Sequence, residues 1–243
     1  MSVTIQKTKS KADFSKFIRF PWQIYRGKER SNPNWVPPLL VGEKELFDQE
    51  KNPFFQHAEM DNFLAYRNGE PAGRISAIVD NNYIEFHGEK AGFFGFLESE
   101  NDPEVAAALL ETAEEWTRKR GMEKIIGPMN PSTNHMLGIL IDSFDEPPIV
   151  QMNYNESYYP ALLEAAGYSK EKDLLCYRMT KDTLELSEKI ARVTELAKKR
   201  GKLTIRNINM KKFDEEVEII RDLYNQGWEK NWGFVPWTRE EFD

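Results

Sequence analysis

The chain has 243 residues, a formal net charge of −7 and no tract dense in lysine or arginine, which argues against a nucleic-acid-binding protein. None of its apolar runs is close to the length of about 18 residues that a membrane-spanning helix needs. Its first residues lack the apolar core of a secretory signal. One cysteine, Cys176, excludes an internal disulfide, and the three histidines lack the spacing of metal ligands. We therefore expect a cytoplasmic protein with no bound metal.

Two segments of the chain resemble each other at an offset of about 200 residues. An apolar run at residues 3–5 precedes an amphipathic helical pattern and an Asn34-Trp35 turn. A similar run at residues 203–205 precedes another helical pattern and an Asn231-Trp232 turn. The repeat predicts tandem copies of one fold, although two amphipathic helices can also resemble each other by chance. We expect a first domain over residues 1–180, a charged linker helix over 181–201 and the beginning of a second domain over 202–243.

The first domain begins with strand signals and continues with a strand-helix-strand unit. Residues 62–67 and 73–79 predict a hairpin around Asn68-Gly69, a strong turn signal. Residues 90–98 predict a central strand, because residues 93–96 are apolar or small throughout. Asp102 and Pro103 then suit the N-cap and the first position of a helix that ends before Gly121.

The remaining elements are a short strand, a loop, a helix and a further strand. Residues 124–126 predict the short strand, and the proline-rich residues 128–150 predict a loop. Residues 155–166 predict a helix that ends at Gly167, and residues 174–179 a strand.

This order of elements, with several motifs, resembles the GNAT superfamily, the Gcn5-related N-acetyltransferases. The residues that carry the resemblance are the hairpin around Asn68-Gly69, the strand at 93–98 with its helix, and the stretch Tyr158-Tyr159-Pro160-Ala161-Leu162-Leu163-Glu164-Ala165-Ala166-Gly167-Tyr168. A bacterial group of tandem GNAT-like proteins is similar in Asn34-Trp35-Val36-Pro37-Pro38, Asn52-Pro53-Phe54-Phe55, Gly92-Phe93-Phe94-Gly95-Phe96 and Asn231-Trp232-Gly233-Phe234-Val235-Pro236. The resemblance implies an α/β fold with a GNAT-type mixed sheet flanked by helices, followed by the start of a second GNAT-like copy. It also implies acyl-CoA-dependent acetyl transfer to a small amine.

The loop after the central strand departs from the family. GNAT enzymes usually hold the pyrophosphate of acetyl-CoA on a Gln/Arg-x-x-Gly-x-Gly/Ala loop at a helix N-terminus. Here residues 99–104 contain no glycine and no basic residue, and the acidic residues are Glu98, Glu100, Asp102 and Glu104. Two explanations remain: the acids repel an anion by about 1 kcal/mol per close pair in water, or Asp102 and Glu104 cap the helix, which we favour. The rival function is a non-catalytic GNAT-like module that supports the second copy or binds a metabolite or a protein partner.

The resemblance implies a catalytic role for three side chains. Tyr159, or its neighbour Tyr158, lies where many GNAT enzymes carry the tyrosine that protonates the departing CoA thiolate. Glu98, at the end of the central strand, could act as a general base through water. The alternatives are that one tyrosine packs in the core and that Glu98 is an exposed residue at a strand end.

Binding residues are expected on either side of the central strand. The cofactor candidates are Phe96 and Leu97 on the strand, Asn101 and Asp102 in the loop, and Asn155 before the tyrosine helix. The substrate candidates are the polar residues after the next strand, namely Asn130, Ser132, Asn134 and His135. Turn formation explains asparagine and serine there equally well.

The end of the chain predicts the start of a helix. Thr238 and Glu241 have the spacing of a capping box, and only two residues follow them. We therefore expect the natural chain to continue beyond Asp243. Five apolar residues of the second copy should either pack against the first copy or form an exposed patch that promotes self-association: Phe213, Ile220, Trp228, Trp232 and Trp237.

Overall fold

The computed structural model describes residues 2–27, 31–180, 188–201 and 206–242. In chain order the elements are β1 (Val3–Lys7), α1 (Lys11–Arg26), α2 (Leu40–Leu46), the 3-10 helix η1 (Pro53–Gln56), β2 (Ala58–Arg67), β3 (Glu70–Asp80), α3 (Asn81–His87), β4 (Ala91–Ser99), α4 (Pro103–Arg118), β5 (Lys124–Ile126), β6 (Met129–Asn130), β7 (Met136–Leu137), α5 (Tyr159–Ala165), α6 (Glu188–Arg200), the 3-10 helix η2 (Met210–Lys212), α7 (Phe213–Trp228) and α8 (Arg239–Phe242).

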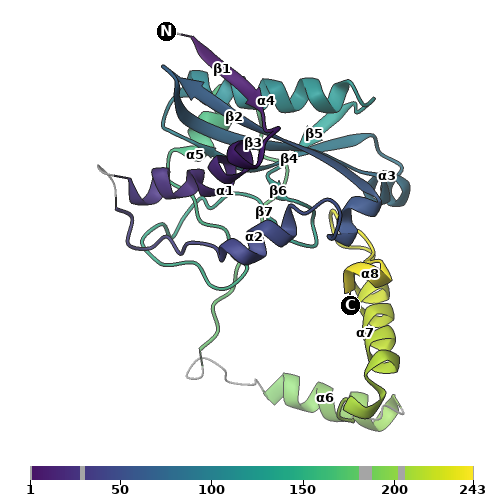
Figure 1. The fold of residues 1–243 in the computed structure, drawn as a ribbon. Coiled ribbons are helices and arrows are strands. Elements are labelled where there is room, and N and C mark those ends of the chain that lie inside the picture. The colour runs from purple at the N-terminus through teal and green to yellow at the C-terminus, as the bar shows by residue number, and fades with distance from the viewer. Residues whose placement is uncertain (1, 28–30, 181–187, 202–205, 243) are drawn as a thin grey trace.

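Five strands form a mixed sheet in the order β1-β2-β3-β4-β5 (Figure 1). The first four strands pair antiparallel, and β4 pairs with β5 in parallel over Ala91–Phe93 only. The predicted mixed sheet flanked by helices is therefore confirmed. The residues up to 180, called the first unit below, contain the whole sheet.

Side chains of the central strands alternate between two apolar layers. Met60 and Leu64 of β2 pack with Phe17 of α1 on one face. Phe63 and Ala65 pack with the helix α4 on the other face, together with α5. Figure 1 shows α1 and α2 on one side of the sheet and α4 on the opposite side. Burial on both faces explains the unbroken apolar sequence of β4, as expected.

Short-range signals determine the turns around the sheet. Asn68 and Gly69 both have positive φ angles, 57° and 86°, which a two-residue hairpin turn requires. Helix α3 was not predicted, although its signals are present. The Asp80 side chain caps the helix by accepting from the Asn82 N–H, and Gly88 ends it in the left-handed conformation.

A bulge lies near the carboxyl end of β4. Ser76 pairs with Gly95 and Arg74 with Glu98, so that Phe96 and Leu97 together oppose one residue of β3. Phe96 has a φ of 50°. The extra residue shifts the alternation and directs Phe96 and Leu97 into opposite apolar layers.

Two predicted elements differ from the structure. Residues 174–179 do not form a strand, and Leu175, Tyr177 and Met179 are exposed, because none of the described strands lies in place to pair with them. The predicted helix at 155–166 begins four residues later, at Tyr159. The predicted strand at 203–205 and the first part of the linker helix lie outside the described residues. The duplication and the domain boundaries therefore stay predictions.

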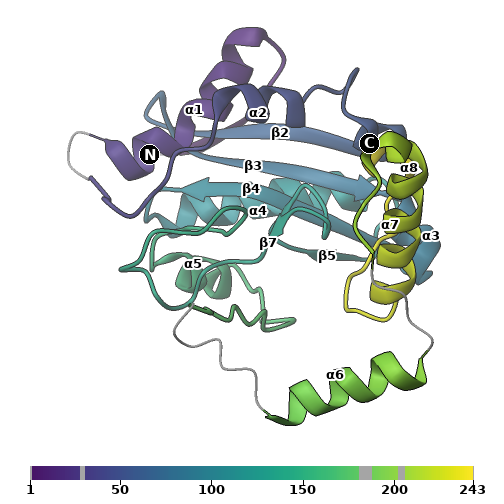
Figure 2. The same cartoon turned by 90° about the horizontal axis from the view of Figure 1, so that it is seen from below.

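The C-terminal elements lie beside the first unit. Helix α6 stands away from the sheet in both views, whereas α8 reaches the first unit near α3 (Figures 1 and 2). The capping box is confirmed: the Glu241 N–H donates to Thr238 Oγ1, and the Glu241 carboxylate accepts from the Thr238 N–H. Of the apolar set named above, four residues are at least one-third exposed, namely Phe213, Ile220, Trp228 and Trp232. Trp237 instead packs against His135 of the first unit.

Candidate functional site

A buried polar cluster lies at the carboxyl end of β4. Glu98 Oε2 accepts hydrogen bonds from the hydroxyl of Tyr25 at 2.9 Å and from that of Tyr159 at 2.5 Å. Both tyrosines are almost completely buried, at 0% and 1% exposure. Glu98 is thus not the exposed strand-end residue considered above, but the acceptor at the centre of a polar core.

Arg74 of β3 supplies the positive charge of this cluster. Its Nη2 lies 4.0 Å from Glu98 Oε1, and its Nη1 donates to the Phe17 carbonyl oxygen at 3.0 Å. The guanidinium also lies over the ring of Phe17. Since Arg74 is buried and the Glu98 side chain is only 14% exposed, their opposite charges compensate each other where little water is present.

The cluster perturbs its own titration. Burial raises the pKa of Glu98, although Arg74 and the two phenolic hydrogen bonds oppose that shift. Burial also raises the pKa of Tyr159 and Tyr25 well above the ordinary value, and the neighbouring Glu98 carboxylate adds to it. The Tyr159 hydroxyl therefore keeps its proton and donates it in the hydrogen bond to Glu98.

The free edge of β4 is occupied by side chains of the same chain. The Phe96 N–H donates to Asn130 Oδ1 at 2.6 Å. The Ser99 N–H donates to the Tyr159 hydroxyl at 3.0 Å, and the Ser99 carbonyl oxygen accepts from the Tyr158 hydroxyl at 2.7 Å. These three backbone groups beyond the short β4–β5 pairing are therefore hydrogen-bonded within the chain.

The N-terminus of α4 is closed by a carboxylate. Asp102 Oδ1 accepts from the Glu104 N–H at 3.0 Å and from the Val105 N–H at 3.4 Å, as an N-cap does. Arg67 clamps this carboxylate, with its Nε 2.7 Å from Asp102 Oδ2, and its Nη2 lies 2.8 Å from Glu104 Oε2. The hydrogen bond with Glu104 is the main reason that the pKa of Arg67 is raised. The cap interpretation of Asp102 is confirmed.

The other cofactor candidates do not converge with this helix start. Leu97 is buried in the apolar layer under α4, and Asn101 is exposed in the loop. Asn155 holds the long loop before α5, because its side chain accepts from the Leu140 N–H and donates to the Leu140 carbonyl oxygen.

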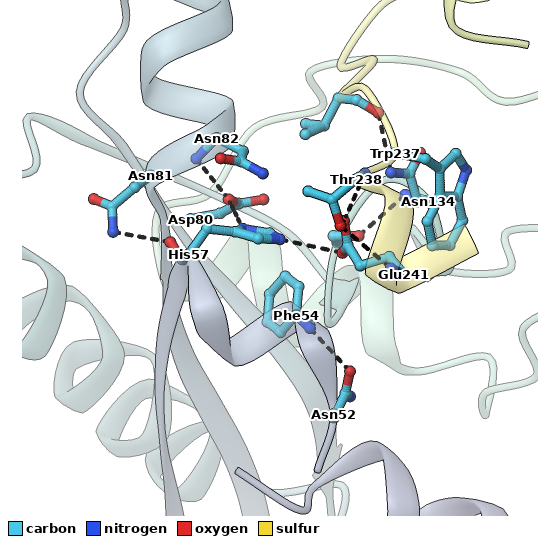
Figure 3. A network of polar contacts seen from close by, with 12 residues as sticks. Asn52, Phe54, His57, Asp80, Asn81, Asn82, Asn134, Trp237, Thr238 and Glu241 are labelled. Carbon is cyan, nitrogen blue, oxygen red and sulfur yellow. Dashed lines mark hydrogen bonds and ion pairs between the residues drawn. The ribbon is translucent and has the colours of Figure 1, made fainter. Parts of the chain in front are cut away.

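The C-terminal residues cover part of the substrate candidates, and Figure 3 shows Asn134 beside Trp237 and Thr238. Asn134 Nδ2 donates to the Val235 carbonyl oxygen at 3.0 Å. Ser132 Oγ lies 2.9 Å from His135 Nδ1, and the His135 ring packs against Trp237. Asn130 is the exception, since it is directed to β4. The catalytic, cofactor and substrate roles assigned from the sequence all stay predictions.

Three residues of these contacts were not expected from the sequence: Tyr25, Arg74 and Arg67. Tyr25 sits in α1, and the two arginines sit in the β2–β3 hairpin. The only available signal was that Arg74 interrupts an otherwise apolar strand, which indicates a charge with a buried partner.

Surface hollows lie elsewhere. One of about 420 Å³ lies between α3 and the residues after α7, and one of about 230 Å³ lies beside Trp116 and Arg120. In the part of the chain that the structure describes, no group of three acidic, histidine or cysteine side chains is placed to hold a metal ion. No described helix is long and apolar enough to cross a bilayer.

Two curated proteins match almost the whole chain. Protein YghO of Escherichia coli is 38% identical over 96% of this chain and 58% of its own length. A bacterial ceramide synthase of Caulobacter vibrioides is 33% identical over 98% of this chain and 61% of its own length. This chain therefore spans about three-fifths of each relative. No family model matches it.

Solved structures match the fold at low sequence identity. Glucosamine-6-phosphate N-acetyltransferase of Arabidopsis thaliana has a TM-score of 0.42 at 11% identity, covering 74% of this chain and all of its own. A tandem GNAT protein from the clavulanic acid biosynthesis pathway has a TM-score of 0.41 at 13% identity, covering 68% of this chain and 43% of its own. Similarity of this size carries no conclusion about activity, and the fold assignment rests on the strand order itself.

The described residues do not fit acyl-CoA, the cofactor that the GNAT resemblance implies. A pantetheine arm needs free polar groups along the edge of β4. Three backbone groups of this edge, one of Phe96 and two of Ser99, are already bound by Asn130, Tyr158 and Tyr159. A pyrophosphate needs bare N–H groups at the start of α4. There, the Asp102 carboxylate accepts the hydrogen bonds of two of these groups.

Proposed function

We propose that this protein is an N-acyltransferase that joins a fatty acyl group to the amine of a long-chain amino alcohol. The observation that carries the proposal is the 33% identity to a bacterial ceramide synthase across 98% of this chain. A ceramide is an N-acylated long-chain amino alcohol, so its synthesis from an acyl donor is acyl transfer to nitrogen. The GNAT resemblance of the sheet supports the same reaction class, as an argument by analogy.

Within that reaction, we propose that the first unit is the half that does not hold acyl-CoA. The carboxylate of Asp102 occupies the place of an anion, and Arg67 keeps it there. A CoA pyrophosphate would have to displace that carboxylate or approach it. Either course costs free energy, because like charges repel strongly where water is partly excluded. The first unit then acts as the structural partner of a CoA-binding part.

Product analysis tests the reaction class. The protein, in the length at which its cells make it, is incubated with a long-chain acyl-CoA and a long-chain amino alcohol, and the amide is sought by mass spectrometry. A parallel mixture holds acetyl-CoA and a short amine. We expect the long-chain amide. Its absence, while the Caulobacter ceramide synthase is active in the same mixture, would refute the proposal.

Calorimetric titration of the 243-residue chain with acetyl-CoA and with a long-chain acyl-CoA tests the second part separately. We expect no saturable heat and no rise in melting temperature. A ligand at 100 times its dissociation constant would add about 2.7 kcal/mol of stability. Saturable binding that becomes tighter in Asp102→Asn would show that α4 does receive the pyrophosphate. Saturable binding that Asp102→Asn leaves unchanged would also contradict the second part, by placing CoA elsewhere on the chain.

A further inference from the structure

The C-terminal segment, defined here as residues 234–241, lies against the first unit although 68 residues separate it from the end of α5. The Phe234 carbonyl oxygen lies 2.8 Å from His87 Nε2 of α3, and the Val235 carbonyl oxygen accepts from Asn134. Phe234 and Val235 are 6% and 3% exposed. This is a packed interface rather than a loose contact.

A histidine lies between two carboxylates at this interface (Figure 3). His57 Nδ1 lies 2.9 Å from Asp80 Oδ1, and its Nε2 lies 3.2 Å from Glu241 Oε1. The side chains of His57, Asp80 and Glu241 are 11%, 3% and 6% exposed. The contact of Nε2 with Glu241 is an ion pair at hydrogen-bond distance, although the N–H is not well aligned with the carboxylate oxygen.

Each carboxylate is also held by its own helix. Asp80 Oδ1 accepts from the Asn82 N–H at 2.9 Å and caps α3. Glu241 Oε2 accepts from the N–H and the hydroxyl of Thr238 at 3.2 and 3.0 Å, which closes the capping box of α8. Burial alone would raise the pKa of Glu241, but the contacts with His57 and Thr238 outweigh it and lower that pKa. Two buried carboxyl groups thus face each other across one imidazole ring.

Among the described residues, His57 is the group that can compensate these charges from within the interface. Burial alone would lower the pKa of His57, but the hydrogen bonds and charges of Asp80 and Glu241 outweigh it and raise the pKa to about 9. His135 faces the same two carboxylates, yet burial lowers its pKa. Arg239, the basic residue of α8, pairs with Glu218 of α7. At neutral pH the ring of His57 therefore carries the charge.

We propose that His57 is a charged clasp that docks the C-terminal segment onto the first unit. The imidazolium joins Asp80, which belongs to the first unit, to Glu241, which belongs to the segment. Ser132, Asn134 and His135 then form the receiving surface of a joint rather than the wall of an open substrate pocket. Loss of the clasp releases the C-terminal segment, because Glu241 is the charged contact of that segment with His57. The sheet stays folded, because Glu241 lies outside it.

Hydrogen exchange monitored by mass spectrometry on the 243-residue chain tests the clasp. Glu241→Gln keeps an oxygen for the capping box but removes the charge, and His57→Gln removes the imidazolium. The matched control is Glu240→Gln, which changes the same charge on the neighbouring exposed residue. We expect exchange in residues 234–241 to rise about tenfold or more in Glu241→Gln and in His57→Gln, but not in Glu240→Gln.

The amides of β2, β3 and β4 serve as the internal reference. In Glu241→Gln they should exchange as in the unmodified chain. Unchanged exchange of the C-terminal segment in Glu241→Gln would overturn the proposal. An equal rise in the segment and in β2–β4 would do the same, since it would show that the charge stabilises the whole fold rather than the docking.

Discussion

Replacement of Glu98 by leucine tests whether the cluster at the end of β4 is a structural polar core. The substitution replaces the carboxylate by an apolar side chain of similar size and so removes the acceptor that Tyr25 and Tyr159 share. It also removes the carboxylate 4.0 Å from the buried Arg74. The resulting loss of stability should therefore exceed that of an ordinary core substitution.

The magnitude follows from the groups that lose partners. The Tyr159 hydroxyl is left without its acceptor in a buried place, at a cost of about 1–3 kcal/mol. Tyr25 loses less, because the Tyr154 carbonyl oxygen lies 3.4 Å from its hydroxyl. The uncompensated charge of Arg74 adds to this, and breaking a buried pair costs about 3–5 kcal/mol in all. For a chain of this size we expect the melting temperature to fall by roughly 10 °C.

Urea and thermal unfolding measure the effect. Glu98→Gln keeps one acceptor oxygen and should cost less than half as much as Glu98→Leu. The matched control is Glu100→Gln in the exposed loop, expected to change stability by less than about 0.5 kcal/mol. A loss below about 1 kcal/mol in Glu98→Leu, or a gain in stability, would refute the reasoning. Such a result is typical of active-site groups whose buried charge is retained for function.

Three further outcomes are expected. Gly95→Ala should destabilise by about 1–3 kcal/mol or more, because its Cβ would lie 1.7 Å from the Met129 carbonyl oxygen, whereas Gly42→Ala, with open space around it in α2, should stabilise by about 0.5–1 kcal/mol in the same urea titration. Asp102→Ala should cost about 1–2 kcal/mol through loss of the α4 cap, and Asp102→Asn clearly less. The pKa of His57 is raised from about 6.5 to about 9, so its contribution to docking is fully present below pH 6.5 and is lost as the pH rises through about 9. Hydrogen exchange of the C-terminal segment, corrected for the intrinsic pH effect, should show this loss in the unmodified chain and not in His57→Gln; a flat profile in both would contradict the assignment.

Local signals predicted most of the sheet correctly. The Asn68-Gly69 turn, the apolar run of β4 and the Asp102-Pro103 start of α4 each depend on residues within one turn or strand. A helix cap acts through a hydrogen bond two or three residues away, and a hairpin turn through its own φ angles. Such interactions can be read from neighbouring residues, and they gave the correct elements.

The residues at 174–179 show where local reasoning fails. Their apolar pattern favours a strand, but a strand exists only when a neighbour pairs with its backbone. Among the described residues no strand pairs with their backbone, and the side chains are exposed. The same limit applies to His57, which carries no signal in the sequence and becomes a buried charge because Asp80 and Glu241 are brought to it.

The sequence by itself determined that the chain forms an α/β fold with a mixed sheet and that an acidic helix start replaces the expected glycine loop. Only the tertiary structure decided what the polar side chains bind. It placed Tyr25 and Arg74 around Glu98, set Arg67 against Asp102, and directed Asn130 to the free edge of β4. These contacts join elements far apart in the chain, and their energies depend on burial and on distances that no local pattern encodes.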